Sequence, residues 1–284
     1  MIHGSTSSAW KAVTGMSKKA YISDYDVIHD CASFLKIDLK RDEMAEFAME
    51  KSINEDSLYA IRELFLYLQE KKKKGIVEML LRLSRLPVKE PKTFQNFEFS
   101  RFHGRQADEL INIQTLSALD ARKNLALIGP QGVGKTHLAM AFGYECCQRG
   151  YKTYFLKATE MNQKFTEARK TGTVARIVSS MVKPTCLIID EIGYCNFDRE
   201  NTRIFFDIVD KRYSKDVPNT MIVTSNTEPD KWNMFFDDDA ALKCAMDRFF
   251  DQALVISMRG RSYRGRQRRK IDVIVGPTDG HDIR

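Results

Sequence analysis

The residues best suited to chemistry form a glycine-rich stretch that ends in a lysine and a threonine. The stretch is Gly129-Pro-Gln-Gly-Val-Gly134-Lys135-Thr136, and it matches the phosphate-binding pattern GxxxxGK[ST] at every fixed position. Glycines let the backbone turn tightly and direct several N–H groups into one concavity. Lys135 can then neutralise the β- and γ-phosphates of a nucleotide, and the Thr136 hydroxyl can ligate Mg²⁺. The alternative is a glycine-rich turn that contains a lysine by chance.

The flanks of this stretch favour a phosphate-binding loop. The apolar run LALIG precedes it and indicates a strand, and THLAMAFGYECCQR follows it and indicates a helix. The N-terminus of that helix would add its partial positive charge to the phosphate site. We therefore predict ATP and Mg²⁺ as ligands, with the following nucleotide-binding residues: Gly129, Pro130, Gln131, Gly132, Val133, Gly134, Lys135, Thr136 and His137.

Two further strand ends carry polar side chains that fit the same site. The run Cys186-Leu-Ile-Ile-Asp190-Glu191 is an apolar strand that ends in two carboxylates. Asp190 is expected to hold Mg²⁺ together with Thr136, and Glu191 is expected to orient or deprotonate an attacking water. The apolar strand Met221–Thr224 ends close to Asn226, whose amide could hold that water near the γ-phosphate, although an asparagine at a strand end also favours a simple turn.

Alternating apolar runs and amphipathic segments predict the elements that position these residues. The expected strands are 125–128, 151–156, 186–189, 221–224 and 253–257, and the expected helices are 136–149, 159–170, 174–182, 199–213 and 240–250. Strands separated by helices pair in parallel with right-handed crossovers. The fold class expected is therefore α/β, a three-layer core with a five-stranded parallel sheet.

The chain before this core has a different pattern. Residues 1–20 are small, polar and aperiodic, and we expect a disordered lead. Residues 21–87 show helical spacing only, which predicts a small all-α N-terminal domain. Leu86-Pro87 ends the helical region, because a residue before proline is pushed out of the helical conformation. The ATPase domain is predicted at 88–258 and a basic tail at 259–284. The run of lysines at 71–74 indicates either a solvated helix face or a phosphate-contacting patch.

The composition is typical of a soluble globular protein. Lys and Arg total 45 against 38 for Asp and Glu, a net charge of +7, and 43% of residues are hydrophobic. The six cysteines show no metal-ligand spacing, which is typical of free thiols in a reducing compartment. The sequence has no run of 18 apolar residues and no secretory signal, so we expect a cytoplasmic protein without a membrane partner.

From about Lys92 to Arg264 the sequence resembles the IstB ATPases, which are transposition helper proteins of bacterial insertion sequences and kin of the DnaC and DnaI helicase loaders. The matching segments are KTFQNFEF, NLALIGPQGVGKTHLAMAFG, CLIIDEIGY, IVTSN, KWNMFFDDDAALKCAMDRFF and RGRSYR. The resemblance implies an AAA+ core, ATP-dependent homo-oligomerisation with ATP sites at subunit interfaces, binding to double-stranded DNA, and a transposase of the same element as partner.

The resemblance also implies an arginine that acts on a neighbouring subunit. The matching residue is Arg248, which would enter the neighbour's ATP site; with Glu191, Lys135 and Asn226 it completes the predicted catalytic set. A helix-end arginine that contacts its own helix carbonyls is the alternative. Few residues follow the last predicted strand, so the usual C-terminal helical lid is not expected. Tyr263 and Arg264 match the family's SYR motif, but neither is assigned a role.

Two groups of basic residues are candidates for DNA contacts. One group crowds the segment after the last strand and contains Arg259, Arg261, Arg264 and Arg266 among other arginines. A solvated basic tail is the alternative for this group. The second group follows the second strand, where the resemblance implies a helix that faces DNA, and contains Lys164, Arg169, Lys170 and Arg176. No base-reading module is visible, so weak sequence selectivity is expected.

The sequence thus favours an AAA+ ATPase that assembles on duplex DNA with ATP, presents target DNA to a transposase and activates it, and is reset by ATP hydrolysis. A replicative helicase loader of the DnaC/DnaI type shares the ATPase motifs and is the nearest alternative. A scaffold that binds ATP without hydrolysing it is a third hypothesis. Glu191 and Asn226 argue against the scaffold, because binding alone requires neither.

Overall fold

The computed structural model describes residues 23–103, 107–260 and 262. The chain divides into two compact units, Met1–Gly75 and Ile76–Arg284. The division lies inside a long helix, α3 (Glu55–Ser84), which runs through Gly75 without a break. The domain boundary inferred from the sequence, at residue 88, lies just beyond the end of this helix and stays a prediction.

The first unit is helical, as predicted. Its helices are α1 (Asp24–Leu35), α2 (Arg41–Glu50) and the first part of α3. Ser23 begins α1 with a capping box, in which its side chain accepts from the Asp26 N–H and the Asp26 carboxylate accepts from the Ser23 N–H. Buried apolar side chains of α1 and α2, including Ile28 and Met44, form the small core of this unit.

The lysine run of α3 has partners within the first unit. Lys72 Nζ donates to the carbonyls of Phe34 and Leu35 at 3.1 and 2.9 Å, at the end of α1. Lys73 lies over the Phe34 ring, and Lys74 pairs with Glu70 four residues earlier. At least one lysine of the run therefore satisfies carbonyl groups that the last turn of a helix leaves unpaired.

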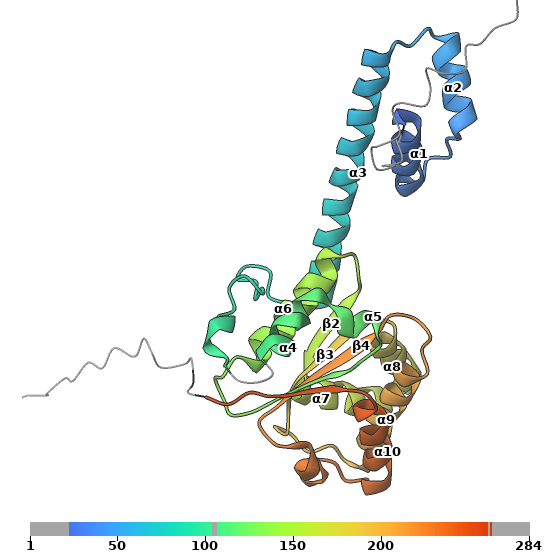
Figure 1. Ribbon diagram of the computed structural model, residues 1–284. Coiled ribbons are helices and arrows are strands. Elements are labelled where there is room, and N and C mark those ends of the chain that lie inside the picture. The colour runs from blue at the N-terminus through green and yellow to red at the C-terminus, as the bar shows by residue number, and fades with distance from the viewer. Residues whose placement is uncertain (1–22, 104–106, 261, 263–284) are drawn as a thin grey trace, which may run out of the picture. The chain divides into compact units, whose positions relative to one another are not determined.

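The second unit is built on one parallel sheet (Figure 1), and the predicted α/β fold is confirmed. The strand order is β2-β3-β4-β1-β5. The strands are β1 (Leu125–Ile128), β2 (Thr153–Lys157), β3 (Cys186–Ile192), β4 (Thr220–Ser225) and β5 (Leu254–Ser257). The helices that alternate with them are α6 (Lys135–Gln148), α7 (Ala158–Lys170), α8 (Val174–Val182), α9 (Arg199–Tyr213) and α10 (Asp239–Phe250).

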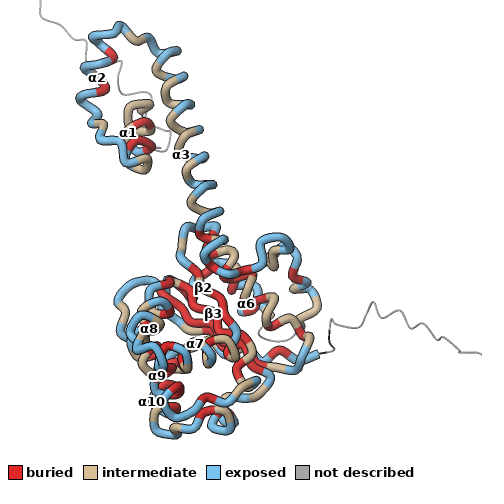
Figure 2. Tube along the Cα trace, turned by 180° about the vertical axis from the view of Figure 1, so that it is seen from behind, coloured by how far each residue is buried: buried red, intermediate tan, exposed pale blue. Residues whose placement is uncertain are grey.

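The sheet separates two apolar cores, which makes the unit three-layered. Alternate residues of β1 face opposite sides: Ala126 and Ile128 pack with α7, α8, α9 and α10, whereas Leu125 and Leu127 pack with α6 and the segment before β1. Figure 2 shows the strands as the most continuously buried part of the unit. A sheet covered on both faces explains why its strands read as unbroken apolar runs rather than as an alternation.

Short helices occupy the segment before β1 and one later connection. They are the single turns η1 (Phe99–Arg101) and η2 (Ile113–Thr115), with α4 (Ala107–Asn112), α5 (Ser117–Asp120) and, after β4, η3 (Pro229–Met234). Residues 86–98, which come before η1, form neither helix nor strand. Phe94 and Phe97 of this stretch are buried beside α6.

Candidate nucleotide site

The glycine-rich stretch connects the carboxyl end of β1 to the start of α6. Gly134 is the N-cap residue of α6 and has a φ of 108°, a left-handed conformation that favours glycine. No side chain caps this helix, so the N–H groups of its first turn point towards the loop without a side-chain acceptor from the N-cap residue. A helix start of this kind, preceded by a glycine loop, is suited to bind phosphate.

Lys135 lies against the loop that precedes it. Its side-chain nitrogen donates to the carbonyls of Gly129 and Pro130, both at 2.7 Å. It also donates to Asn226 Oδ1 at 2.7 Å, across from the end of β4. The structure therefore brings together two predicted site residues that are 91 positions apart. The lysine is 7% exposed and stands at the place where a phosphate oxygen could exchange with its present acceptors.

Asp190 at the end of β3 accepts hydrogen bonds from two hydroxyl groups. Thr136 Oγ1 donates to Asp190 Oδ1 at 2.8 Å, and Thr224 Oγ1 donates to the same oxygen at 2.6 Å. Asp190 is 1% exposed, and burial raises the pKa of its carboxyl. Carboxylate and hydroxyl oxygens are hard ligands that suit Mg²⁺, so the donor atoms fit the predicted metal. Thr224 was not predicted, although a threonine within the buried, apolar run of β4 could have indicated a site residue.

Glu191 follows Asp190 and adopts a left-handed backbone conformation, with a φ of 63°. Its N–H donates to Thr224 Oγ1 at 3.0 Å, and its carboxylate pairs with Lys157 Nζ at 2.9 Å. Lys157 is the last residue of β2, directly beside Asp190 in the strand register. Lys157 was not predicted from the sequence, because its proximity to Glu191 results from strand pairing between residues 33 positions apart, Lys157 and Asp190.

A tyrosine connects the loop to the end of β4. Asn226 Nδ2 donates to the Tyr194 hydroxyl at 2.6 Å, and the Gln131 side chain also donates to this hydroxyl. Asn226 thus has its amide oxygen on Lys135 and its amide nitrogen on Tyr194. Both ends of the amide are held, which fixes its orientation. Tyr194 is a further residue that sequence reasoning did not select.

The segment before η1 forms one wall of a cavity beside the loop. This cavity has a volume of about 450 Å³, and it is lined by Gly132, Gly134, Lys135, Phe97 and Met140 among others. His137 Nε2 contacts the Thr93 carbonyl at 3.1 Å and Asn96 Oδ1 at 2.8 Å. Burial lowers the pKa of His137. The predicted nucleotide residue His137 therefore holds the segment of residues 93–97 against α6.

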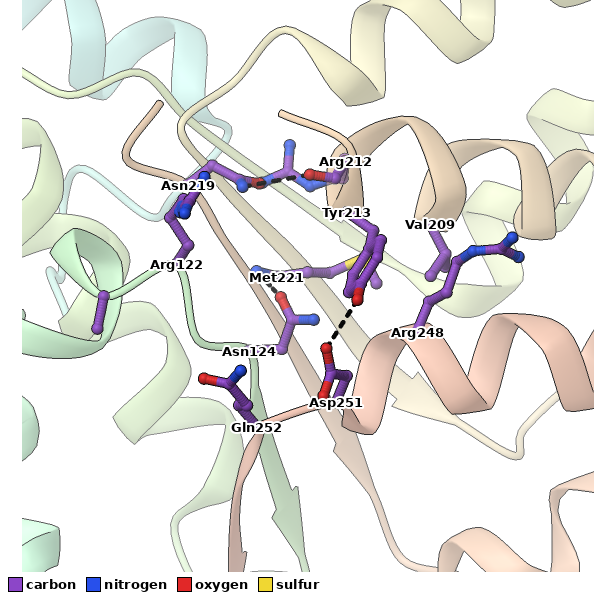
Figure 3. Close-up of a pocket in the computed structure, with 11 residues that line it drawn as sticks. Arg122, Asn124, Val209, Arg212, Tyr213, Asn219, Met221, Arg248, Asp251 and Gln252 are labelled. Carbon is purple, nitrogen blue, oxygen red and sulfur yellow. Dashed lines mark hydrogen bonds between the residues drawn. The ribbon is translucent and has the colours of Figure 1, made fainter. Parts of the chain in front are cut away.

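Arg248 lies at the other edge of the sheet. Its Nε pairs with Asp210 Oδ1 at 3.0 Å, and its guanidinium lies 5.0 Å from the centre of the Phe206 ring. Arg248 is one of the residues that line a polar cavity of about 300 Å³. Figure 3 shows this cavity with Asn124, the residue before β1, and with the Tyr213 hydroxyl donating to Asp251. Because Asn124 lines this cavity and precedes β1, the cavity lies at the amino ends of the strands. The loop at Gly129 follows the carboxyl end of β1, so Arg248 and its own phosphate loop face opposite edges.

The basic residues predicted to contact DNA differ in their surroundings. Arg169 donates to the Asp198 carboxylate at 2.7 and 2.9 Å and to Asn201, and Lys164 lies 3.6 Å from Glu160. Lys170 and Arg176 are exposed, and neither forms an ion pair with any residue that the structure describes. Arg259 is exposed as well. The remaining three candidates, Arg261, Arg264 and Arg266, lie outside the described residues.

Across residues 23–103 and 107–260, no helix is long and apolar enough to span a membrane.

Known proteins resemble both the sequence and the fold. The family model described as IstB-like ATP binding protein matches residues 36–271. A protein named as an ATP-binding protein of insertion sequence IS5376, from Geobacillus stearothermophilus, is 34% identical over 226 residues, which are 80% of this chain and 87% of that protein. The corresponding protein named for IS21, from Pseudomonas aeruginosa, is 30% identical over 71% of this chain and 74% of its own length.

The fold also occurs in a solved replication initiator. The structure titled as DnaA bound to AMPPCP and single-stranded DNA has a TM-score of 0.50 and 22% identity, over 62% of this chain and 52% of that chain. Identity at this level indicates a shared fold alone. The family match, in contrast, covers most of the sequence, including every residue of the loop, Asp190, Glu191, Asn226 and Arg248. The chain belongs to the IstB-like ATP-binding protein family.

Proposed function

We propose that this protein is an AAA+ ATPase that assembles on duplex DNA when it binds ATP and assists transposition. One observation supports the ATPase most directly. Lys135 and Thr136 begin α6 and form two hydrogen-bonded pairs, with Asn226 after β4 and with Asp190 in β3, at the carboxyl edge of the sheet. Phosphoryl transfer depends mainly on positioning and on charge stabilisation, and this group supplies both.

The residues present fit ATP and Mg²⁺. The N-terminus of α6 and Lys135 would hold the phosphates, while Thr136 and Asp190 would hold the metal through oxygen ligands. Mg²⁺ would supply positive charge that offsets the charge developing on the phosphate oxygens. Because burial raises the pKa of the Asp190 carboxyl, its ionised form gains from a nearby cation.

Glu191 is our candidate for the base that accepts a proton from the attacking water. It is half-buried and follows Asp190 directly, and its left-handed backbone turns it away from the buried course of β3. Asn226, fixed at both ends of its amide, would hold the water or the γ-phosphate. The ion pair with Lys157 gives the Glu191 carboxylate a defined position beside the site.

Arg248 is our candidate for the arginine that acts on a second subunit. Since it lies at the amino edge of the sheet, it cannot serve the phosphate loop of its own chain. An arginine supplied by a neighbour stabilises transition-state charge and makes turnover depend on assembly. In the single chain, Asp210 and Phe206 hold its side chain in place. The ATP sites would then lie at subunit interfaces of a homo-oligomer.

We propose DNA contacts at Lys170, Arg176 and the segment that begins at Arg259. These side chains are exposed on the second unit. With four to six phosphate contacts for each bound unit, the logarithm of affinity should fall with the logarithm of salt at a slope of about −4 to −5. The relatives are named as proteins of insertion sequences, which favours a transposase of the same element as partner.

The proposal is tested by replacing the candidate base. Glu191→Gln should keep affinity for ATP and for DNA, and it should lower turnover by about 10²-fold or more, because general-base catalysis contributes that much. Phosphate release and binding of a fluorescent nucleotide measure the two effects separately. Turnover at the wild-type rate would show that Glu191 is not the base.

A second experiment separates transposition helper from helicase loader. Labelled random-sequence duplex and single-stranded DNA are titrated with ATP, ADP or no nucleotide. Tight duplex binding only with ATP is expected. A preference for single strands would instead support a helicase loader. If neither form of DNA bound, the DNA part of the proposal would fail and the ATPase part would stand.

A further inference from the structure

Met258 and Ser262, which follow β5, lie directly on the phosphate loop. β5 and β1 pair in parallel, with Ser257 opposite Ile128, so both strands end at the same edge of the sheet. The next residue continues the pairing, since the Met258 N–H donates to the Ile128 carbonyl at 2.7 Å. Figure 1 shows this part of the chain in red at the end of the sheet. The segment Met258–Ser262, of which the structure describes residues 258–260 and 262, therefore begins where the loop begins.

Two glycines of the loop are in contact with this segment. A Cβ atom at Gly129 would lie 2.0 Å from the Met258 carbonyl oxygen. A Cβ atom at Gly132 would lie 1.9 Å from Ser262 Oγ and 2.8 Å from Ser262 Cβ. Neither distance is possible for a real side chain. Gly132 is therefore required both for its left-handed φ of 78° and for the close approach of Ser262.

Met258 also approaches a third glycine of the loop, Gly134, which lines the cavity beside the loop. A Cβ atom at Gly134 would lie 3.0 Å from the Phe97 ring and 3.8 Å from the methyl group of Met258. Phe97, Gly132 and Gly134 all line the cavity of about 450 Å³ described above. Two segments from distant parts of the sequence thus close around the glycines that would cradle a nucleotide.

We propose that Met258 and Ser262 form a wall of the nucleotide pocket in the same subunit, and that the Ser262 hydroxyl binds the sugar–phosphate part of the nucleotide. The inference rests on the proposed nucleotide binding. Ser262 is exposed, and its hydroxyl stands at Gly132, whose backbone belongs to the phosphate cradle. A hydroxyl can donate to a phosphate oxygen or accept from a ribose hydroxyl. This gives Ser262 of the RGRSYR match a place at the ATP site.

Substitution of the serine tests the contact to the nucleotide. Ser262→Ala should weaken binding of a fluorescent ATP analogue about 3- to 10-fold, the effect of losing one hydrogen bond. Ser257→Ala is the matched control, since Ser257 is an exposed serine at the end of β5, five residues before Ser262. It should change affinity less than 2-fold, as expected for a surface substitution. Equal affinities for the two variants would overturn the role of Ser262.

A double-mutant cycle tests the approach to Gly132. Gly132→Ala should weaken nucleotide binding strongly, through backbone strain and the clash with Ser262. Adding Ser262→Gly removes the two closest atoms, so the double variant should recover part of the loss, whereas Ser262→Gly alone should weaken binding. Thermal melts establish that each variant is folded. Strictly additive effects would overturn the contact.

Hydrogen exchange on the full chain distinguishes this inference from the proposed function. With ADP or an ATP analogue, peptides covering Gly129–Thr136 and peptides covering 258–264 should both exchange more slowly than without nucleotide. Slower exchange in the loop alone, or faster exchange at 258–264, would overturn the wall and leave nucleotide binding intact. No change in either region would overturn both proposals.

Discussion

Single residues on the second unit divide into those held by partners and those available to a ligand. Arg169 illustrates the first kind, because it binds the Asp198 carboxylate and Asn201 at the start of α9. Arg176 illustrates the second kind, with an exposed side chain on the next helix. In the sequence both were equal candidates for DNA contact. The difference depends on neighbours that only the folded chain provides.

This difference predicts opposite effects of two similar substitutions. Arg169→Ala should lower the melting temperature by a few degrees, because a partly exposed ion pair and its hydrogen bonds contribute about 1 kcal/mol or less. Arg176→Ala should leave the melting temperature unchanged and should reduce the salt slope of DNA binding by about 0.9. Thermal melts and DNA titrations at several salt concentrations measure both. An unchanged slope for Arg176→Ala would remove it from the DNA surface.

Among the elements, α10 matters most for the proposed interface, because it carries Arg248. Asp238 is its N-cap residue, and its side chain accepts from the Ala241 N–H at 3.1 Å. The same carboxylate accepts from Arg203 at 3.0 Å and lies 3.6 Å from Arg199. The hydrogen bond from the Ala241 N–H is the main cause of a lowered pKa of Asp238. The ionised carboxylate is therefore the form that stabilises the helix start.

Replacing this cap should destabilise the protein in a pH-dependent way. Asp238→Ala should lower the melting temperature at pH 7, and Asp238→Asn should lower it less, since asparagine can still cap the helix. A carboxyl whose pKa is lowered by folding contributes stability above its ordinary pKa of about 4, and the contribution is lost as the pH falls through the folded pKa. The difference between wild type and Asp238→Ala should therefore shrink below about pH 4. A constant difference from pH 3 to pH 8 would contradict the ionic contribution.

The sequence predicted the regular elements of the second unit well, because buried strands and amphipathic helices have clear apolar patterns. The start of β2 was placed at residue 151, two residues early. There the N–H groups of Gly150 and Tyr151 donate to the carbonyls of Cys147 and Cys146 at the end of α6. The strand therefore begins only at Thr153. The short helices α4 and α5 were not predicted, since six and four residues are too few to show a period.

The sequence predicted those residues of the candidate site that belong to recognisable motifs. The loop, Asp190 and Asn226 each carry a local signal. Lys157 carries no such signal, and the polar side chain of Thr224 in an apolar run does not by itself point to Asp190, because strand register brings these residues, far apart in sequence, to the same end of the sheet. Met258 and Ser262 were missed for the same reason, since only the pairing of β5 with β1 places them on the glycines.

At the scale of the whole molecule, Arg248 and the phosphate loop lie at opposite edges of one sheet. A ring or spiral of subunits in one repeated orientation would bring the arginine of each chain to the loop of the next. Turnover would then be a property of pairs of subunits. Single chains would bind nucleotide without hydrolysing it efficiently.

Mixing two inactive variants tests this arrangement. Arg248→Ala keeps an intact phosphate loop, and Lys135→Ala keeps an intact arginine. Each alone should lose on the order of 10³-fold in turnover. Mixed in equal amounts with ATP and DNA, they should recover clearly measurable phosphate release, because some interfaces combine both intact parts. The control mixture replaces Lys135→Ala by the double variant Lys135→Ala/Arg248→Ala and should stay inactive. Activity no higher than the sum of the separate variants would contradict action between subunits.

The left-handed backbone at Glu191 has a consequence for how this position changes in copies of the gene that are no longer active. A glutamate in this conformation costs about 1 kcal/mol relative to a residue that adopts it freely, a cost that the proposed reaction would offset. In copies of an insertion sequence that no longer move, selection for turnover ceases while selection against misfolding continues. Glycine or asparagine should then accumulate at this position ahead of its buried neighbours. A glycine or asparagine at position 191 would thus identify copies of the insertion sequence that no longer transpose.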